Sequence, residues 1–227
     1  HTRLQGDWSS DVCSSDLASF DQEPLTLARF LIGKVLRHKV NGVWLATRII
    51  ETEAYYMSEK GSHSSLGYTE ARKAMFMAPG TIYMYFARGG DSLNFSAQGE
   101  GNGVLIKSGI VHVDRQSPDK TIAMMQSLNP INGRLRPADR LCSGQTLLCK
   151  SLGLRVKDWN QRRLRRGTLV LQDLGDSPSE LIQAKRLGIP QGRDEHLPYR
   201  FIHPEYPHRA TKNPLSGEHW IIQPRPD

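Results

Sequence analysis

The sequence has few of the features that mark several large classes of protein. It contains only three cysteines in 227 residues, too few for the disulfide framework of a small secreted protein. No apolar run approaches the roughly 20 residues that a membrane-spanning helix requires, and no internal repeat or low-complexity tract is apparent. What is present is 38% hydrophobic residues. This is enough to bury one sizeable core, so we expect one globular domain.

Negative charge is also scarce. The chain carries 30 lysines and arginines against 23 acidic residues, which gives a net charge of +7 and a pI near 9.5. This balance favours a polyanionic partner, either nucleic acid or an anionic membrane surface, and the shortage of long apolar runs weakens the second. Charge alone does not identify the partner, because many basic proteins bind neither.

The first residues differ in character from the rest. Residues 6–17, GDWSSDVCSSDL, resemble the translation of a widely used sequencing-library adapter. We therefore expect residues 1–17 to be a non-native segment and residues 18–227 to form the single domain.

Metal-binding and redox patterns are sparse. Outside that first segment the cysteines are Cys142 and Cys149. Their spacing suits no zinc site, and we expect both to be buried thiols in a reducing cytoplasm. His196, His203 and His208 are irregularly spaced, which favours a solvated loop over a metal site.

Local patterns predict a helix followed by a hairpin. Apolar residues at i, i+4 spacing predict a short helix within residues 21–34. The pair Asn41-Gly42 separates two apolar segments, residues 35–40 and 43–55. This pair favours a tight type I′ hairpin turn because both positions accept a positive φ.

The later part of the chain gives weaker patterns. We expect strands at 81–86 and 104–107, a helix that starts at Ser117-Pro118-Asp119, a second helix within 141–154 and a short strand near 199–203. The rest of the C-terminal part, rich in proline and histidine, is expected to be irregular. The basic cluster at 161–166, QRRLRR, suits either a phosphate-contacting surface or a solvated loop.

The most suggestive chemistry lies on the second strand of the hairpin. The period of two places Glu51, Glu53 and Tyr55 on one face, and it gives Tyr83 and Tyr85 a common side of a later strand. A carboxylate among aromatic rings on a basic chain suits an enzyme that acts on a nucleobase drawn out of DNA. An ion pair with a nearby arginine is the structural alternative for either carboxylate.

Six segments, in one order and with similar spacing, resemble the alkyladenine (3-methyladenine) DNA glycosylase family. They are RIIETEAY, the segment around His63, MFMAPGTIYMY, LNFSAQGEGNGVLIK, RLCSGQTLLCKSLGL, and RLGI with PYRF. One such string would be a weak signal, but six collinear ones extend the resemblance over residues 19–212. The resemblance implies a single α+β domain with a curved antiparallel β-sheet flanked by helices.

The resemblance implies that Glu53 is the catalytic residue. Glu53 matches the family's general base, which deprotonates the water that attacks C1′ of the damaged nucleotide. A carboxylate suits this step because glycosidic cleavage passes through an oxocarbenium-like state that a nearby negative charge stabilises. Glu51, two residues away, is the rival candidate.

Substrate-binding residues are implied in the same way. Tyr55 and Tyr85 match the aromatic residues that stack on the flipped base, and His63 matches the third wall of the pocket. Asn94 matches a residue at the pocket edge that excludes normal purines. Lys107 replaces a family arginine near the attacking water, which keeps the charge but loses the bidentate fork.

The clearest departure from the family lies at Arg88. The family pushes a bulky side chain into the gap that the flipped nucleotide leaves, whereas this chain has Arg88 followed by two glycines on a shorter loop. We expect Arg88 to contact DNA, either by filling the stack with its planar guanidinium or by binding a phosphate.

The expected function is hydrolysis of the N-glycosidic bond of alkylated or deaminated purines in double-stranded DNA, which leaves an abasic site. We expect a monofunctional, monomeric enzyme that needs no metal ion and no organic cofactor. It is expected to have no membrane partner and to lie in the cytoplasm, at the nucleoid if the source is bacterial. Two alternatives stay open: a lyase that forms a Schiff base through Lys107, and a non-catalytic lesion-binding protein with the same pocket. An RNA-binding barrel would fit the charge but leaves Glu53 unexplained.

Overall fold

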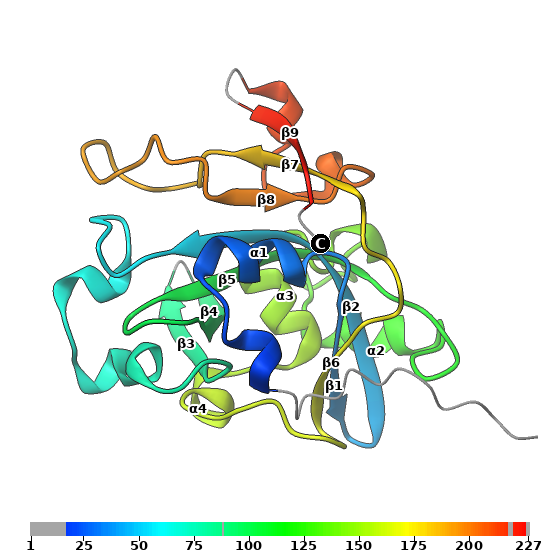
Figure 1. Ribbon diagram of the computed structural model, residues 1–227. Coiled ribbons are helices and arrows are strands. Elements are labelled where there is room, and N and C mark those ends of the chain that lie inside the picture. Colours follow the sequence, from blue (N-terminus) through cyan, green and yellow to red (C-terminus); the bar gives the residue numbers. More distant parts are fainter. Residues whose placement is uncertain (1–16, 88, 218–219, 226–227) are drawn as a thin grey trace, which may run out of the picture.

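The computed structural model describes residues 17–87, 89–217 and 220–225. Within these ranges nine strands form one antiparallel sheet (Figure 1). The strands are β1 (Val35–Val40), β2 (Val43–Tyr55), β3 (Ile82–Ala87), β4 (Gly90–Ser96), β5 (Gly103–Val111), β6 (Leu169–Gln172), β7 (Glu180–Ala184), β8 (Arg200–Ile202) and β9 (Trp220–Pro224). Their order is β3-β4-β5-β2-β8-β7-β9, and β1 pairs with both β2 and β6.

Short helices cover the sheet. The α-helices are α1 (Pro24–Leu31), α2 (Thr121–Leu128), α3 (Gln145–Leu152) and α4 (Val156–Trp159). The 3₁₀ helices are η1 (Leu17–Phe20), η2 (His63–Leu66), η3 (Glu70–Phe76), η4 (Ala138–Arg140), η5 (Pro207–Arg209) and η6 (Pro214–Ser216). The predicted α+β class with an antiparallel sheet and flanking helices is confirmed. No helix among the described residues is long and apolar enough to cross a membrane.

The long strand β2 is the centre of the sheet. Along one edge it pairs with β1 in its first half and with β8 at residues 51–53, while β5 pairs along the other edge. The pairing with β5 shifts register between Ile49 and Thr52, and such a bulge bends a strand and increases its twist. The predicted hairpin is confirmed, because Asn41 and Gly42 have φ values of 49° and 82°. The curvature brings the second half of β2 beside β8 and the segment that precedes it.

Helix α1 packs on the face of β2 that is opposite to Glu53. The Glu23 side chain caps its first turn by accepting from the Thr26 amide at 3.2 Å, and the helix gives way to Gly33 at φ +87°. A Cβ at Gly33 would lie 1.8 Å from a backbone oxygen of a neighbouring loop, so only glycine fits there. The Thr52 hydroxyl donates to the Ala28 carbonyl at 2.9 Å. These contacts confirm the predicted helix and hold it against the sheet.

The main core lies between the sheet and helices α1, α2 and α3. Helix α3 buries Leu148, Cys149 and Leu152 in it, as its sequence predicted. Cys142 and Cys149 are free and buried, and burial raises the pKa of the Cys142 thiol to about 12. Both cysteines therefore act as small apolar core residues.

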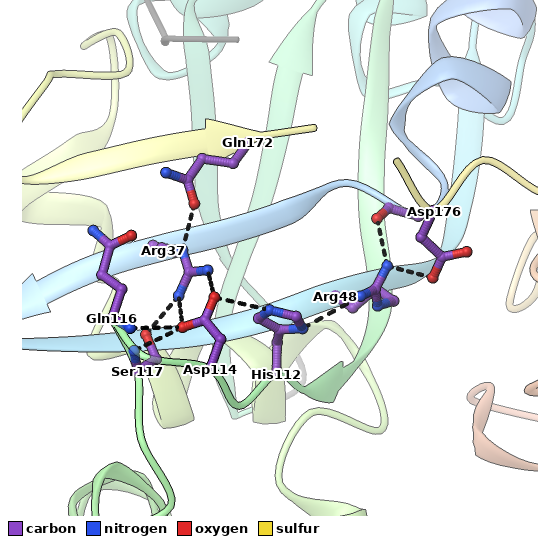
Figure 2. A network of polar contacts seen from close by, with 9 residues as sticks. Arg37, Arg48, His112, Asp114, Gln116, Ser117, Gln172 and Asp176 are labelled. Carbon is purple, nitrogen blue, oxygen red and sulfur yellow. Dashed lines mark hydrogen bonds and ion pairs between the residues drawn. The ribbon is translucent and has the colours of Figure 1, made fainter. Parts of the chain in front are cut away.

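A network of polar side chains connects β1, β2 and β6 (Figure 2). Arg37 is 1% exposed; it donates to Ser117 Oγ at 2.7 Å and to Gln172 Oε1 at 2.5 Å, and it pairs with Asp114. His112 lies between Asp114, at 3.2 Å, and Arg48, at 3.4 Å, and Arg48 pairs with Asp176. Every charged side chain in this network has a partner of opposite charge. The network fastens the hairpin to the chain that follows β5.

Two sequence predictions for the later part of the chain are wrong in part. The helix predicted to follow Ser117-Pro118-Asp119 is present as α2, but it begins at Thr121 without a side-chain cap, because the Ser117 hydroxyl accepts from Arg37 and its amide donates to Asp114. The C-terminal part was expected to be irregular around one short strand. That strand, β8, is present, but β7 and β9 pair beside it, because long-range pairing supplied an order that the local pattern lacked.

Candidate active site

A cavity of about 260 Å³ opens at the end of the sheet formed by β3, β4, β5 and β2. Its lining includes Tyr55, His63, Tyr85, Asn94 and Lys107, which come from five different elements. All five were singled out from the sequence. The fold thus brings together residues spread over more than fifty positions of the chain.

Glu53 lies behind the wall of this cavity and is 0% exposed. Its Oε2 accepts a hydrogen bond from the Tyr55 hydroxyl at 2.6 Å, and its Oε1 accepts one from the Leu187 amide at 3.1 Å. The Lys107 ammonium lies 3.4 Å from Oε1. Three groups that can donate, one of them charged, thus surround the carboxylate. All three donors belong to residues that line the cavity.

Glu51, the rival carboxylate, is equally buried but is closed off. Its Oε1 accepts from Arg200 Nε at 2.6 Å, and its Oε2 accepts from the amide and the hydroxyl of Thr211 at 2.8 and 3.0 Å. Glu51 does not line the cavity. This is the structural ion pair that the sequence left open for either carboxylate.

Three rings form the aromatic side of the cavity. The His63 and Tyr85 centroids are 4.4 Å apart with planes at 63°, and the Tyr83 and Tyr85 centroids are 5.5 Å apart at 35°. His63 Nδ1 is 3.3 Å from the Tyr83 hydroxyl. Burial, followed by the charges of Arg72 and Arg193, lowers the pKa of His63, so the ring is neutral at pH 7. A neutral imidazole can offer one donor and one acceptor.

Tyr55 lines the same cavity from the end of β2. Burial and then the neighbouring Glu53 carboxylate raise the pKa of Tyr55 well above its ordinary value. The phenol therefore keeps its proton and remains a donor to Glu53. The Arg186 guanidinium lies 4.5 Å from the ring centroid of Tyr55, on the side of a segment that also lines the cavity.

Asn94 and Lys107 are placed by strand pairing. Asn94, on β4, is opposite Tyr83 on one side and Leu105 on the other, and its Nδ2 donates to the Tyr83 carbonyl at 3.1 Å. It is 7% exposed. Lys107 follows Leu105 on the same face of β5 and is 4% exposed. Both side chains are held where strands β3, β4, β5 and β2 meet.

The predicted DNA contact Arg88 lies outside the described residues. Its neighbours are described: Ala87 at the end of β3 pairs with Gly90 at the start of β4. Gly89 has φ +78°. Phe86, next to the turn, is 70% exposed.

The site contains residues that side-chain patterns did not reveal. Tyr83 was placed on the same strand side as Tyr85 but received no role. Gln145 begins α3, lines the cavity and donates to Ser92 Oγ at 2.7 Å. The segment 187–190 lines the cavity and supplies a backbone amide to Glu53. The string RLGI was the only signal for this segment, since an amide donor leaves no mark on side-chain type. Among the described residues no group of three or more His, Cys, Asp or Glu could hold a metal ion.

Comparison with known proteins agrees with this geometry. The family model described as methylpurine-DNA glycosylase matches residues 18–207. A Pseudomonas aeruginosa protein provisionally named 3-methyladenine DNA glycosylase is 59% identical over 197 residues, which cover 86% of this chain and 82% of that protein. A protein of the same name from Pseudomonas savastanoi is 58% identical over 86% of this chain and 88% of its own length. The DNA-3-methyladenine glycosylase of Mus musculus is 36% identical over 80% of this chain and 56% of its own length. The chain therefore belongs to the methylpurine-DNA glycosylase family of base-excision repair enzymes.

Proposed function

We propose that this glycosylase hydrolyses the N-glycosidic bond of alkylated or deaminated purines in double-stranded DNA, with Glu53 as the general base. The observation that carries the proposal is the fully buried Glu53 carboxylate, held by three donors that line an aromatic-walled cavity. In this proposal residues 18–227 are the glycosylase domain, residues 1–17 are foreign to it, and the enzyme acts as a monomer.

Base recognition is assigned to the walls of the cavity. Tyr55, Tyr85 and His63 stack on the flipped purine, and each stacking contact contributes roughly 1 to 3 kcal/mol toward the cost of unstacking the base. Asn94 stands at the edge of the same cavity. In that position it excludes the exocyclic amino group of a normal purine by contact.

For a cationic base, the reaction needs only groups that the site provides. Glu53 accepts a proton from water as the water oxygen bonds to C1′, and the electron pair of the broken C1′–N bond leaves with the base. The carboxylate charge stabilises the oxocarbenium-like state. Cationic bases such as 3-methyladenine and 7-methylguanine leave as neutral molecules, whereas hypoxanthine needs a proton.

The position of Lys107 favours hydrolysis by water over a lyase mechanism through a Schiff base. Its ammonium lies 3.4 Å from Glu53 Oε1, and a paired ammonium is not a nucleophile for a Schiff base. We therefore assign Lys107 to positioning Glu53 and the water. Borohydride trapping tests this assignment: active protein should give no covalent adduct with DNA, and an adduct would establish the lyase.

The basic cluster is assigned to the DNA backbone. Arg162, Arg163, Arg165 and Arg166 are all exposed, and none forms an ion pair with another described residue. The loop is ordered, because the Ile82 amide at the start of β3 donates to the Arg162 carbonyl at 2.7 Å. An ordered surface of unpaired cations fits the phosphates of a duplex. Work on chromosomal DNA would place the enzyme in the cytoplasm, at the nucleoid in a bacterium.

The deciding experiment is release of free base from methylated and hypoxanthine-containing duplexes under single-turnover conditions, with protein in excess. Glu53→Gln removes the carboxylate that acts as general base. Glu100→Gln, on the exposed surface, is the matched control. We expect release by the parent and by Glu100→Gln, and loss with Glu53→Gln. Saturable binding of damaged duplex without release by the parent would instead support a lesion-binding protein.

A further inference from the structure

We propose that Arg186 is a positioning residue for excision: it holds Tyr55 and the Leu187 amide in place, two of the three donors to Glu53. This inference rests on the proposed role of Glu53 as general base. Arg186 itself does not line the cavity. It lies behind Tyr55, where it cannot touch a bound base.

The guanidinium of Arg186 lies between two aromatic rings. Its central carbon is 4.5 Å from the Tyr55 ring centroid and 5.4 Å from that of Tyr199, and the side chain is 0% exposed. Cations at these distances are attracted by aromatic faces, and the attraction grows when both are removed from water. Arg186 therefore fixes the orientation of the Tyr55 ring, whose hydroxyl donates to Glu53.

The backbone contacts of Arg186 reach the same carboxylate by a second route. Its Nη1 donates to the carbonyl of Ala54 at 2.9 Å, and Ala54 lies between Glu53 and Tyr55 in β2. The next residue along the chain, Leu187, donates its amide to Glu53 Oε1 at 3.1 Å. The Arg186 side chain thus links the start of the cavity-lining segment 187–190 to strand β2, which carries Glu53.

Burial of this cation is incompletely compensated. Glu59 Oε2 forms an ion pair with Arg186 Nη1 at 2.5 Å. Among the described residues, Arg186 Nε and Arg186 Nη2 have no hydrogen-bond partner. Burial raises the pKa of Glu59, and the Arg186 charge opposes that rise. Unpartnered buried donors reduce stability, so we attribute the arrangement to function.

The charge of Arg186 also acts on Tyr55. Burial and Glu53 raise the pKa of Tyr55, and the Arg186 charge works against both, which makes the phenol a stronger donor. Loss of this cation would weaken the Tyr55 bond to Glu53 and free the Leu187 amide. A carboxylate held by fewer donors is less firmly placed to accept the proton of the attacking water.

The experiment measures single-turnover excision against pH, at saturating protein, for Arg186→Gln and Arg186→Lys, with Arg115→Gln on the exposed surface as the matched control. We expect Arg186→Gln to slow excision about 10- to 100-fold, as displaced catalytic groups do, and to change the pH profile, because the charge that acts on Tyr55 and Glu59 is lost. Arg186→Lys keeps the charge but not the planar stack, so it should recover only part of the rate. Arg115→Gln should match the parent.

Thermal unfolding separates positioning from a purely structural role. If Arg186→Gln melts earlier but keeps the parental rate and pH profile per folded molecule, the inference is overturned. If Arg186→Gln does not fold, Arg186→Lys decides by the same two readouts, and a parental rate with a parental profile again overturns it. If only this inference fails, the parent still releases the base from damaged DNA and Glu53→Gln still does not. A parent that releases no base overturns the proposed function as well.

Discussion

Glu51 and Glu53 lie two residues apart on β2, and both are 0% exposed. Their surroundings differ completely. Arg200 and Thr211 close off Glu51, whereas the donors to Glu53 form part of a cavity wall. Burial therefore does not distinguish a structural carboxylate from the proposed general base. The difference lies in whether the partners themselves face an open space.

The polar network around Arg37 makes the same point on a larger scale. It buries charge among β1, β2 and β6, and each cation in it meets a carboxylate (Figure 2). Around Tyr55, by contrast, Arg186 retains two donors without partners among the described residues. Closed networks stabilise the fold, and the site keeps groups whose hydrogen bonding is unfinished.

The largest expected effect separates the two carboxylates. Glu53→Gln should slow excision by about 10²- to 10⁴-fold, the usual contribution of a general base, and it should also reduce the free energy of unfolding because Lys107 stays buried without its partner. Glu51→Gln should leave excision per folded molecule near the parental rate, yet reduce the free energy of unfolding by about 3 kcal/mol because Arg200 stays buried without its partner. Single-turnover kinetics and urea unfolding of both variants check this. The opposite pattern would make Glu51 the base.

The aromatic wall should give the next largest effect. Tyr85→Leu removes a stacking face from the cavity and should lower excision by about 5- to 150-fold, which corresponds to roughly 1 to 3 kcal/mol. Tyr85→Phe keeps the ring and is the matched control, with a rate within about threefold of the parent. Equal losses in both variants would mean that the hydroxyl, and not the ring, is what matters.

Asp114 tests the closed network by its pH dependence. Burial alone would raise its pKa, but hydrogen bonds from Arg37 and the Ser117 amide, with the Arg37 charge, lower it from 3.8 to about 2. A lowered carboxyl pKa contributes stability above the ordinary value, and this contribution is lost as pH falls through about 2. Asp114→Asn should cost about 1 to 2 kcal/mol at neutral pH, after discounting for a side chain that is 31% exposed.

Urea unfolding of the parent and Asp114→Asn between pH 2 and 6 measures this difference. The two stabilities should converge as the pH falls from 3.8 toward about 2. Excision at neutral pH should be unchanged, since the network does not line the cavity. A pH-independent gap would show that the carboxylate charge is not what stabilises this region.

The smallest expected effect concerns the basic loop. Arg162→Gln/Arg163→Gln should weaken DNA binding a few-fold at moderate salt and reduce the slope of log affinity against log salt by about 1 for each lost phosphate contact. Binding titrations from low to moderate salt give the slope. An unchanged slope would mean that these arginines face solvent and do not contact DNA. The loop would then resemble the polar network around Arg37, which has no role at the DNA.

Elements with strong local patterns were predictable. The periodic segment within residues 21–34 predicted α1. The pair Asn41-Gly42 predicted the hairpin because both residues accept a positive φ. Weak patterns failed where distant partners decided the outcome. Strands β7 and β9 form by pairing with each other and with β8, and Ser117 caps no helix because Arg37, 80 residues away, holds its hydroxyl.

The sequence by itself determined the chemical groups of the site: a carboxylate, paired tyrosines, a histidine and a lysine at spacings that place them on strand faces. Only the tertiary structure decided which carboxylate stays available. Glu51 meets Arg200 across 149 positions of the chain, and Glu53 meets the Leu187 amide across 134. Hydrogen bonds act over about 3 Å, so a carboxylate's partners depend on how the chain folds back, which no local pattern records.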